Sequence, residues 1–295
     1  MNANARTAMD PHTAAFQQHR PRLMGVAYRM LGSRADAQDV LQDAWLRWQS
    51  TDADRVQTAQ AWLVTTVTRL CVDRLRAART EREHYSGPWL PEPWIAEGTA
   101  PPADARAELA SDLSIALLVV LERLSPDERA AFLLHDVFDS DYAEVATVLN
   151  RSEAACRQLV HRARTQVRQD KVRFTATPDA AQALLHRFVD AMRAQNHEAM
   201  LSLFAADATW TPDGGGKVPA ATKVLRGPRA LARFAVAVWR LHLQYLTLEE
   251  VQINGTPGLV LREGAVPRLA LALQTDGTQI HGVYAVLNPE KLRGL

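Results

Sequence analysis

The chain has 295 residues, of which 47% are hydrophobic and 23% charged, as in a soluble globular protein with room for two or three domains. Its net charge of +1 does not by itself indicate nucleic-acid binding, so such a function must rest on a local charge pattern. Cys71 and Cys156 form neither a disulfide framework nor a metal-ligand motif, and no signal peptide or membrane-spanning run is recognisable. We therefore expect a cytoplasmic protein without a cofactor, metal or membrane contact.

The first part of the chain predicts helices. Apolar residues at helical spacing predict one helix over Pro21–Leu31 and, after Gly32 and the cap Ser33, a second. Residues 1–11 are expected to be frayed. The outer face of the second helix carries acidic and amide side chains, among them Asp39, Gln42 and Asp43. This face is either a solvated surface or a docking site for a basic partner, and the spacing does not separate the two interpretations.

A long third helix is predicted from Ala61 to about Glu83. One flank carries a row of arginines: Arg69, Arg74, Arg76, Arg79 and Arg82. Such a row can follow a DNA backbone. The alternative is a helix held by ion pairs with the interleaved acids Asp73, Glu81 and Glu83.

The composition changes at Tyr85, where GPWLPEPW begins a Pro-rich linker. Trp89, Leu90 and Trp94 are unusual in a plain spacer, and we expect them to dock on another surface. Helices resume near Asp104. The sequence Ser125-Pro-Asp-Glu128 predicts a capping box with proline at the first helical position.

Residues 141–168 predict a helix-turn-helix. The first helix has an apolar stripe of Tyr142, Val145, Ala146 and Leu149, and Ser152 is a suitable N-cap for the second helix. The inner face of the second helix contains Cys156, Val160, Ala163 and Val167. Its outer face carries side chains that can reach base edges and phosphates: Arg157, Gln158, His161, Arg162 and Arg164. The alternative is a solvated basic helix in an ordinary bundle.

The last third of the chain predicts a separate α+β domain. Three helices, at 180–194, 197–204 and 227–241, surround a strand at 208–211 and the sequence DGGGK. Strand-like runs follow at 245–253, 257–262, 267–274 and 279–287, and Asn254-Gly255 and Asp276-Gly277 are hairpin turns. Helices followed by an antiparallel sheet indicate an α+β fold.

Three segments together resemble a bacterial extracytoplasmic-function sigma factor. They are YRMLGSRADAQDVLQDAWLRW, AWLVTTVTRLCVDRLRAARTERE, and LSPDERAAFLLHDVF with the helix-turn-helix. The C-terminal part resembles the SnoaL-like domain of the ketosteroid-isomerase (NTF2) type, a cone of helices and sheet fused to one sigma subgroup. That subgroup has counterparts of WLPEP, DGGGK and NPEKL. The implied domains are sigma domain 2 (12–84), a linker (85–108), sigma domain 4 (109–173) and the SnoaL-like domain (178–295).

The resemblance also implies roles for particular residues. The face with Asp39, Gln42 and Asp43 would bind the β′ clamp helices of RNA polymerase core, and domain 4 the β flap. Promoter DNA would meet Arg69, Arg76, Arg79 and Arg82 at the −10 element and the helix after Ser152 at the −35 element. The C-terminal domain would regulate in cis through a contact between three segments. These are the linker (Trp89, Leu90, Pro91), the glycine loop (Asp213, Gly214, Gly215, Gly216, Lys217) and the C-terminal motif (Asn288, Pro289, Glu290, Lys291). In that contact Lys217 is expected to pair with Glu92 of the linker.

Two further hypotheses stay open at this point. SnoaL relatives include polyketide cyclases and isomerases, and candidate acid-base groups here are His186, Asp190, Asp207, Asp213, His281 and Tyr284. No paired spacing singles out an acid and a base, so we expect no catalysis and regard the domain as a candidate sensor of a small-molecule ligand. The other hypothesis is a DNA-binding regulator that never joins polymerase, which would leave the acidic face of residues 36–43 without a role.

Overall fold

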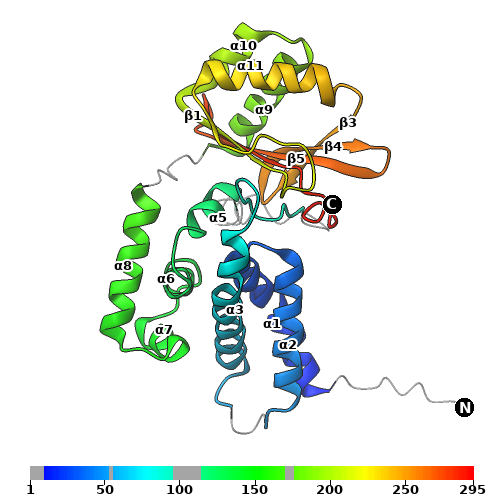
Figure 1. The fold of residues 1–295 in the computed structure, drawn as a ribbon. Coiled ribbons are helices and arrows are strands. Elements are labelled where there is room, and N and C mark those ends of the chain that lie inside the picture. Colours follow the sequence, from blue (N-terminus) through cyan, green and yellow to red (C-terminus); the bar gives the residue numbers. More distant parts are fainter. Residues whose placement is uncertain (1–9, 53–55, 96–113, 170–175) are drawn as a thin grey trace, which may run out of the picture. The chain divides into compact units, whose positions relative to one another are not determined.

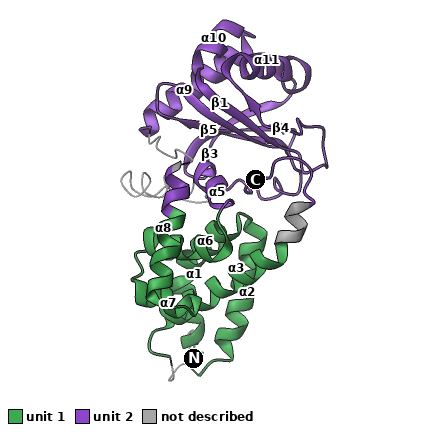
Figure 2. Ribbon diagram, turned by 60° about the vertical axis from the view of Figure 1, so that its left-hand side comes forward, with its two compact units in different colours: residues 1–79, 124–163 green, residues 80–123, 164–295 purple. Residues whose placement is uncertain are grey.

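The computed structural model describes residues 10–52, 56–95, 114–169 and 176–295, without the side chains of residues 79–83 and 169. Contacts divide the chain into two compact units. Unit 1 comprises residues 1–79 and 124–163, and unit 2 comprises residues 80–123 and 164–295 (Figure 2). Each unit therefore combines segments that are far apart in the sequence.

Unit 1 begins with three helices, α1 (Pro11–Leu31), α2 (Arg34–Gln49) and α3 (Ala59–Glu83) (Figure 1). Gly32 adopts φ 67° and ends α1, and Ser33 caps α2 by accepting from the Asp36 amide, as its sequence predicts. The inward residues of these helices, such as Leu23, Ala37 and Leu63, are buried. The helical spacing of apolar residues thus predicted the first core correctly.

The start of α1 differs from the sequence-based expectation. The helix begins at Pro11, after the N-cap Asp10, and continues through Pro21. Its first turns are tied to α2, because Trp48 donates from Nε1 to the His12 carbonyl at 3.0 Å and the Phe16 ring lies 5.0 Å from that of Trp45. These tertiary contacts offset the backbone hydrogen bond that an internal proline removes.

The rest of unit 1 contains α6 (Pro126–Phe132), a π-helical turn η2 (Leu133–Val137), α7 (Tyr142–Leu149) and most of α8 (Glu153–Gln169). The predicted capping box is present: the Glu128 amide donates to Ser125 Oγ, and the Ser125 amide donates back to Glu128. A second capping box, Asp141 with Glu144, begins α7. Local sequence therefore determines where α6 and α7 start.

Unit 2 contains a six-stranded sheet of order β2-β1-β6-β5-β4-β3. The strands are β1 (Phe204–Asp213), β2 (Leu225–Arg226), β3 (Thr247–Ile253), β4 (Thr256–Glu263), β5 (Val266–Thr275) and β6 (Ile280–Val286). The helices are α5 (Ile115–Leu121), α9 (Pro178–Arg193), α10 (His197–Leu203) and α11 (Pro228–Val238), which continues into the π-helical turn η3 (Trp239–Leu243). Asn254 and Gly255, at φ 53° and 76°, form the predicted turn between β3 and β4. The predicted α+β fold is confirmed.

Both faces of this sheet are apolar, because side chains alternate along each strand. Leu259, Leu271 and Val283 belong to the cluster that packs under α9, α10 and α11. Their neighbours Val260, Ala272 and Tyr284 belong to a second cluster on the opposite face. A sheet with two apolar faces needs a cover on each.

The second face is covered by two segments from outside the C-terminal domain, together with the end of the chain. Leu90 of the linker and Ile115 and Ala116 of α5 share the second cluster with Leu292, near the end of the chain. Figure 1 shows α5 and the chain's C-terminus on the side of the sheet away from α10 and α11. The linker and α5 are thus integral to unit 2.

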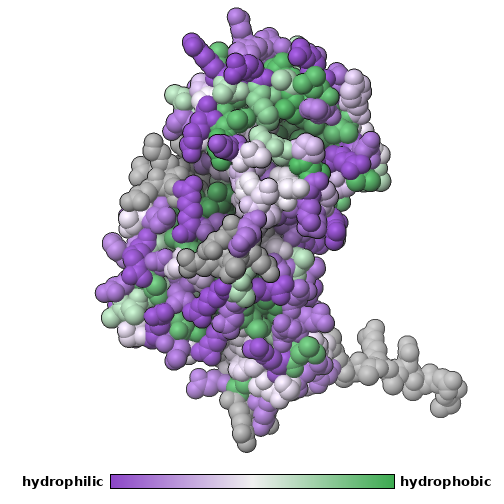
Figure 3. All heavy atoms as spheres, in the orientation of Figure 1, coloured by the Kyte–Doolittle hydropathy of each residue, from purple (hydrophilic) through white to green (hydrophobic). Residues whose placement is uncertain are grey.

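The helical side of unit 2 carries some exposed apolar surface. Leu241 in η3 and Tyr245 just after it are 60% and 82% exposed. On the face drawn in Figure 3, hydrophobic residues gather around α11, whereas hydrophilic residues prevail over the helices of unit 1.

Candidate nucleic-acid interface and regulatory contact

The helix-turn-helix predicted from the sequence is formed by α7, a tight turn and α8. Asn150 ends α7 in the left-handed conformation at φ 52°, and Ser152 Oγ accepts from the Ala155 amide at 3.2 Å to begin α8. Cys156, Val160 and Ala163 are buried as expected. In α7 the fully buried residues are Val145 and Val148, whereas the rest of the predicted stripe is only half-buried. A helix of two turns buries a narrower face than its apolar pattern suggests.

The candidate −35 residues lie on the outer face of α8. Arg157, Gln158, His161 and Arg162 are exposed, and Arg164 is half-buried. Arg157 lies 3.3 Å from Glu153, and its guanidinium is 5.3 Å from the centre of the Tyr142 ring. This cation–π contact positions Arg157 beside the first helix of the motif.

Arg162 has a defined carboxylate partner in unit 1. Its Nε donates to Glu128 Oε1 at 2.8 Å. Partial burial raises the pKa of the Glu128 carboxyl, but hydrogen bonds from Ser125 and the Arg162 guanidinium outweigh it and hold that pKa below its ordinary value. Glu128 is therefore ionised at neutral pH and neutralises one arginine of the candidate surface.

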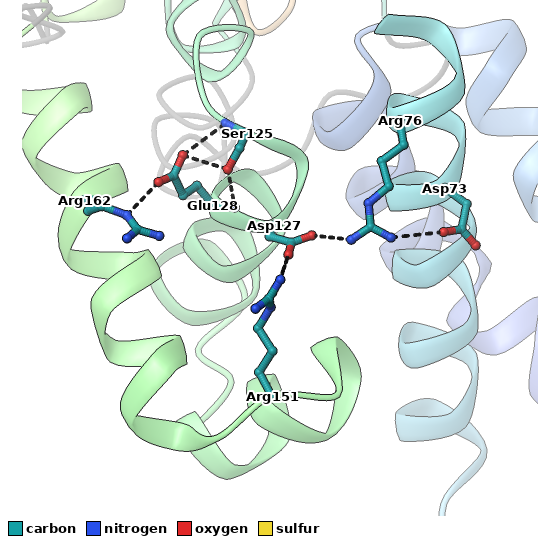
Figure 4. A network of polar contacts seen from close by, with 7 residues as sticks. All are labelled: Asp73, Arg76, Ser125, Asp127, Glu128, Arg151 and Arg162. Atoms are coloured by element: carbon teal, nitrogen blue, oxygen red, sulfur yellow. Dashed lines mark hydrogen bonds and ion pairs between the residues drawn. The ribbon is translucent and has the colours of Figure 1, made fainter.

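Two candidate −10 arginines on α3 contact other helices of unit 1, α7 and α6. Arg69 donates to the carbonyls of Thr147 and Val148, both at 2.8 Å, which are end carbonyls of α7 without an intrahelical partner. Arg76 donates to Asp127 at 2.8 Å and lies 3.5 Å from Asp73 (Figure 4). The side chains of Arg79 and Arg82, also predicted from the sequence, lie outside the described part of the structure.

The acidic face of α2 is only partly neutralised. Asp39, Gln42 and Asp43 are exposed. Arg74, from the arginine row of α3, pairs with Asp36 and lies 3.3 Å from Asp39. Arg74 therefore belongs to an ion-pair network with α2, whereas the alternative interpretation of that row placed the partners among the acids of the same helix. Asp39 keeps 61% of its side-chain surface exposed.

A buried polar centre joins the linker, the glycine loop and the C-terminal motif in unit 2. Asp213, the last residue of β1, is completely buried. Its carboxylate accepts from the Tyr85 hydroxyl at 2.6 Å, the Leu90 amide at 2.8 Å and Lys291 Nζ at 2.7 Å. Each oxygen of this buried charge is thus hydrogen-bonded, which makes its burial tolerable.

Lys291 and Tyr85 complete this centre. Lys291 also donates to the Leu90 carbonyl at 2.6 Å, and its Nζ lies 4.1 Å from the centre of the Trp89 ring. Burial and the hydrogen bond to Asp213 raise the pKa of Tyr85, so its hydroxyl stays protonated and donates. Tyr85 in turn accepts from Asn288 Nδ2 at 3.0 Å.

The glycine loop allows the linker to approach closely. Gly215 has φ 58°, and a Cβ there would lie 2.8 Å from the Tyr85 hydroxyl oxygen and would also collide with Asn288. Gly216 has φ 69°, and a Cβ there would lie 2.9 Å from Ser86 Cβ. Gly214 is buried beside Val218 and Ala220.

The remaining residues of the predicted contact lie around it. Pro91 is buried, and Pro289 is exposed. Lys217 pairs with Glu290 at 3.5 Å rather than with Glu92, so that detail of the sequence-based expectation is wrong. Glu92 is buried, 8% exposed, whereas the Lys217 side chain stays at the surface. Sequence inspection missed the roles of Tyr85 and Asn254. The Asn254 amide donates to the Trp94 carbonyl at 2.8 Å, and the Trp94 amide donates to Asn254 Oδ1 at 3.0 Å.

Two candidate acid-base residues of the enzyme hypothesis, His281 and Asp207, lie near each other, and several others contact residues outside the candidate set. His186 lies 2.8 Å from Glu250, Asp190 is exposed at the surface, and Tyr284 donates to Gln274 at 2.9 Å. His281 lies 3.8 Å from Asp207 and 3.0 Å from Asp276. Asp213 is held by the linker. Among the described residues, no group of three or more His, Cys, Asp or Glu side chains could hold a metal ion.

Two family models match the chain. Sigma-70 region 2 matches residues 15–81, and Sigma-70 region 4 matches residues 114–167. The first match covers α1–α3, and the second covers α5 and the helix-turn-helix. Fold and matches define the class of protein, a sigma factor of bacterial RNA polymerase.

The chain is also similar over nearly its whole length to named relatives. It is 39% identical over 290 residues to the ECF RNA polymerase sigma factor SigJ of Mycobacterium tuberculosis, covering 95% of this chain and 92% of that protein. It is 28% identical to the probable ECF sigma factor SigI of the same species, covering 96% and 95%. The crystal structure of M. tuberculosis SigJ superposes with a TM-score of 0.77 at 36% identity, covering 95% of this chain and 98% of that one.

The chain therefore belongs to the extracytoplasmic-function (ECF) RNA polymerase sigma factors, and it directs RNA polymerase to promoters to initiate transcription. Within the described ranges, no helix combines the length and the apolar character needed to cross a membrane.

Proposed function

We propose that the C-terminal domain, from about residue 178, regulates initiation in cis by holding the linker and α5. The observation that carries this proposal is the buried centre at Asp213, where Tyr85, Leu90 and Lys291 meet. Ile115 and Ala116 of α5, within the region 4 match, belong to the apolar cluster on the same face of the sheet. The domain thus holds both the segment after region 2 and the first helix of region 4.

The physical consequence concerns the distance between the two DNA-binding regions. The −10 and −35 elements lie apart from each other on the duplex. Region 2 and region 4 must be held at a matching separation to bind both elements. Docking residues 85–95 on the sheet fixes this part of the linker and so limits that separation.

Purified transcription with core polymerase tests the proposal. Leu90 is fully buried, so the double change Trp89→Ala and Leu90→Ala should weaken docking by about 2–5 kcal/mol and change promoter-dependent transcription. Val266→Ala, at an apolar side chain of the same sheet that is 51% exposed, is the matched control and should behave as wild type. Equal transcription from all three proteins would show that linker docking has no regulatory role.

The residue roles within the sigma domains are part of the same proposal. Arg157, Gln158, His161, Arg162 and Arg164 contact the −35 element, and Arg69, Arg76, Arg79 and Arg82 the −10 element. Asp39, Gln42 and Asp43 contact the β′ clamp helices, and region 4 contacts the β flap. The exposure of Gln42 and of the outer face of α8 supports these roles. Copurification with core polymerase separates this proposal from a DNA-binding regulator that acts alone.

We propose further that the C-terminal domain is not catalytic and that the protein works in the cytoplasm, where polymerase and DNA are. The candidate carboxylate Asp213 already accepts from Tyr85, Leu90 and Lys291, which speaks against an acid-base role. A small-molecule ligand in this domain stays a prediction, which a thermal-shift screen with polyketide and steroid ligands can test.

A further inference from the structure

Unit 1 holds region 2 and the helix-turn-helix of region 4 together through polar contacts. Arg129, 2% exposed on α6, donates to the Met30 carbonyl at the end of α1. Arg22 donates to the Phe138 carbonyl at 3.1 Å, and the Arg29 guanidinium lies 5.1 Å from the Phe138 ring centre. Because Arg129 is a buried charge, its carbonyl partner matters for the stability of this arrangement.

One of the arginines assigned to promoter DNA, Arg76, takes part in the same arrangement. Asp127 lies between Arg76 and a second arginine, Arg151, in Figure 4: Oδ1 accepts from Arg76 of region 2 at 2.8 Å, and Oδ2 accepts from Arg151 in the turn of the helix-turn-helix, with Nε at 3.1 Å. Its side chain is only 16% exposed. A carboxylate that binds two guanidinium groups occupies the positions that a DNA phosphate would take.

We infer that Asp127 is an intramolecular latch, which closes region 2 onto region 4 by bridging Arg76 and Arg151 in the place of DNA phosphates. Arg69 reinforces the latch by donating to the end carbonyls of α7. In this closed state, hydrogen bonds of 2.8 Å join helix α3 to α7 through Arg69 and to α6 through Arg76. The two promoter elements lie apart on the duplex, so a molecule that binds both must hold its two DNA-binding regions apart.

The latch must therefore open before one molecule can bind both elements. Its Arg–Asp pairs are partly exposed, and such pairs are individually weak and screened by salt. Opening is thus easy for a partner that supplies phosphates or binds region 2. Attraction between Asp127 and the two arginines closes the latch in the free protein, and DNA phosphates open it by competing for the same arginines.

The latch itself can be tested without DNA or polymerase, so that its failure is separable from a failure of the assigned DNA contacts. Gln38 on α2 and Ala154 on α8 are exposed, and the native Cys71 and Cys156 are buried. Gln38→Cys and Ala154→Cys in the full-length chain accept spin labels, and electron spin resonance measures the distance between them. A short, narrow distance distribution is expected for the wild-type background. Asp127→Asn and Arg151→Ala should each add longer distances.

Asp73→Asn is the matched control, because Asp73 also pairs with Arg76 but lies in region 2 itself. It should leave the distances unchanged. On a short duplex of arbitrary sequence, Asp127→Asn should raise affinity by about threefold or more over Asp73→Asn, whereas Arg151→Ala should lower it. Distances that stay short in both latch variants, or equal DNA affinity for Asp127→Asn and Asp73→Asn, would overturn the inference. Longer distances in the latch variants, together with an unchanged −35 sequence preference in Arg157→Ala and Arg162→Ala, would leave the latch standing and remove the −35 assignment instead.

Discussion

Lys291 Nζ donates to Asp213 Oδ2 at 2.7 Å, across 78 residues of sequence, in a site where Asp213 has no exposed surface. The same ammonium group donates to the Leu90 carbonyl. One residue of the C-terminal motif therefore both neutralises a buried charge of the sheet and holds the linker. Breaking such a pair from one side leaves the other charge buried and unpaired.

Lys291→Met should release the linker. Loss of one partner of a buried pair costs about 3–5 kcal/mol, and the Leu90 amide, which donates to Asp213, should lose its protection. Hydrogen exchange of the Leu90 amide measures this directly. Lys217→Met, at a surface pair with Glu290, should leave exchange unaltered. Undiminished protection of Leu90 in Lys291→Met would contradict the assigned role of the pair.

Gly215→Ala should weaken the contact between the glycine loop and the linker by more than the strain of its backbone alone would. An alanine in the left-handed conformation costs about 1–2 kcal/mol, and here its Cβ would also meet Tyr85 and Asn288. Gly264→Ala is a matched control, because Gly264 has φ 59° and a Cβ there has open space. Limited proteolysis near residue 90 should be faster in the Gly215 variant alone. Equal cleavage of both variants would mean that close approach at Gly215 is unimportant.

Arg157→Ala and Arg162→Ala should each lower promoter-specific binding. Loss of a base-edge contact costs about 1–3 kcal/mol and relaxes preference at one position, while loss of a phosphate contact weakens all sequences alike. Binding to promoter duplexes randomised at the −35 element distinguishes these results. Arg187→Ala, at an exposed arginine of α9, is the control. If sequence preference survives in both variants, the recognition face lies elsewhere.

Charge reversal at Asp39 and Asp43 should weaken binding to core polymerase without unfolding unit 1. Both residues are exposed, and Arg74 retains Asp36 as a partner when Asp39 is changed. Copurification with core polymerase measures the effect. Asp73→Lys, which reverses another exposed charge of the same unit, should bind core as wild type does. Normal holoenzyme formation by the double variant would remove the docking assignment.

Asp276→Asn should destabilise the C-terminal domain in a pH-dependent way. Slight burial raises the pKa of the Asp276 carboxyl, but hydrogen bonds from the Gln279 amide and from His281 outweigh it and hold that pKa well below its ordinary value. A depressed folded-state pKa gives stability that is present above the unfolded pKa of about 3.9 and is lost as pH falls below it.

Thermal melts should therefore show the largest difference between wild type and Asp276→Asn at neutral pH, shrinking below about pH 4. Glu263→Gln, at an exposed carboxylate paired with Arg268, should show little difference at any pH. A constant gap for Asp276→Asn down to strongly acidic pH would contradict the expected role of this carboxylate.

The elements that could be predicted from the sequence are those whose signals are local. Capping residues such as Ser125, Ser152 and the Asn254-Gly255 turn act within a few residues of themselves, and alternation along β4 to β6 follows from strand geometry. The resemblance in three helical segments also gave the family, which the comparisons confirm.

Which charged residues pair with one another could not be predicted, because it depends on the packing of distant segments. Lys217 pairs with Glu290 and not with Glu92, Arg76 pairs with Asp127, and Arg74 pairs with Asp36. Partners of this kind are set by how distant segments pack, and many alternative pairs are equal in sequence terms. The same holds for α1, which continues through Pro21 because its first turns pack on α2, and for the linker, which becomes the cover of an apolar sheet face. Burial of that face requires a partner, but its pattern does not specify which segment supplies it.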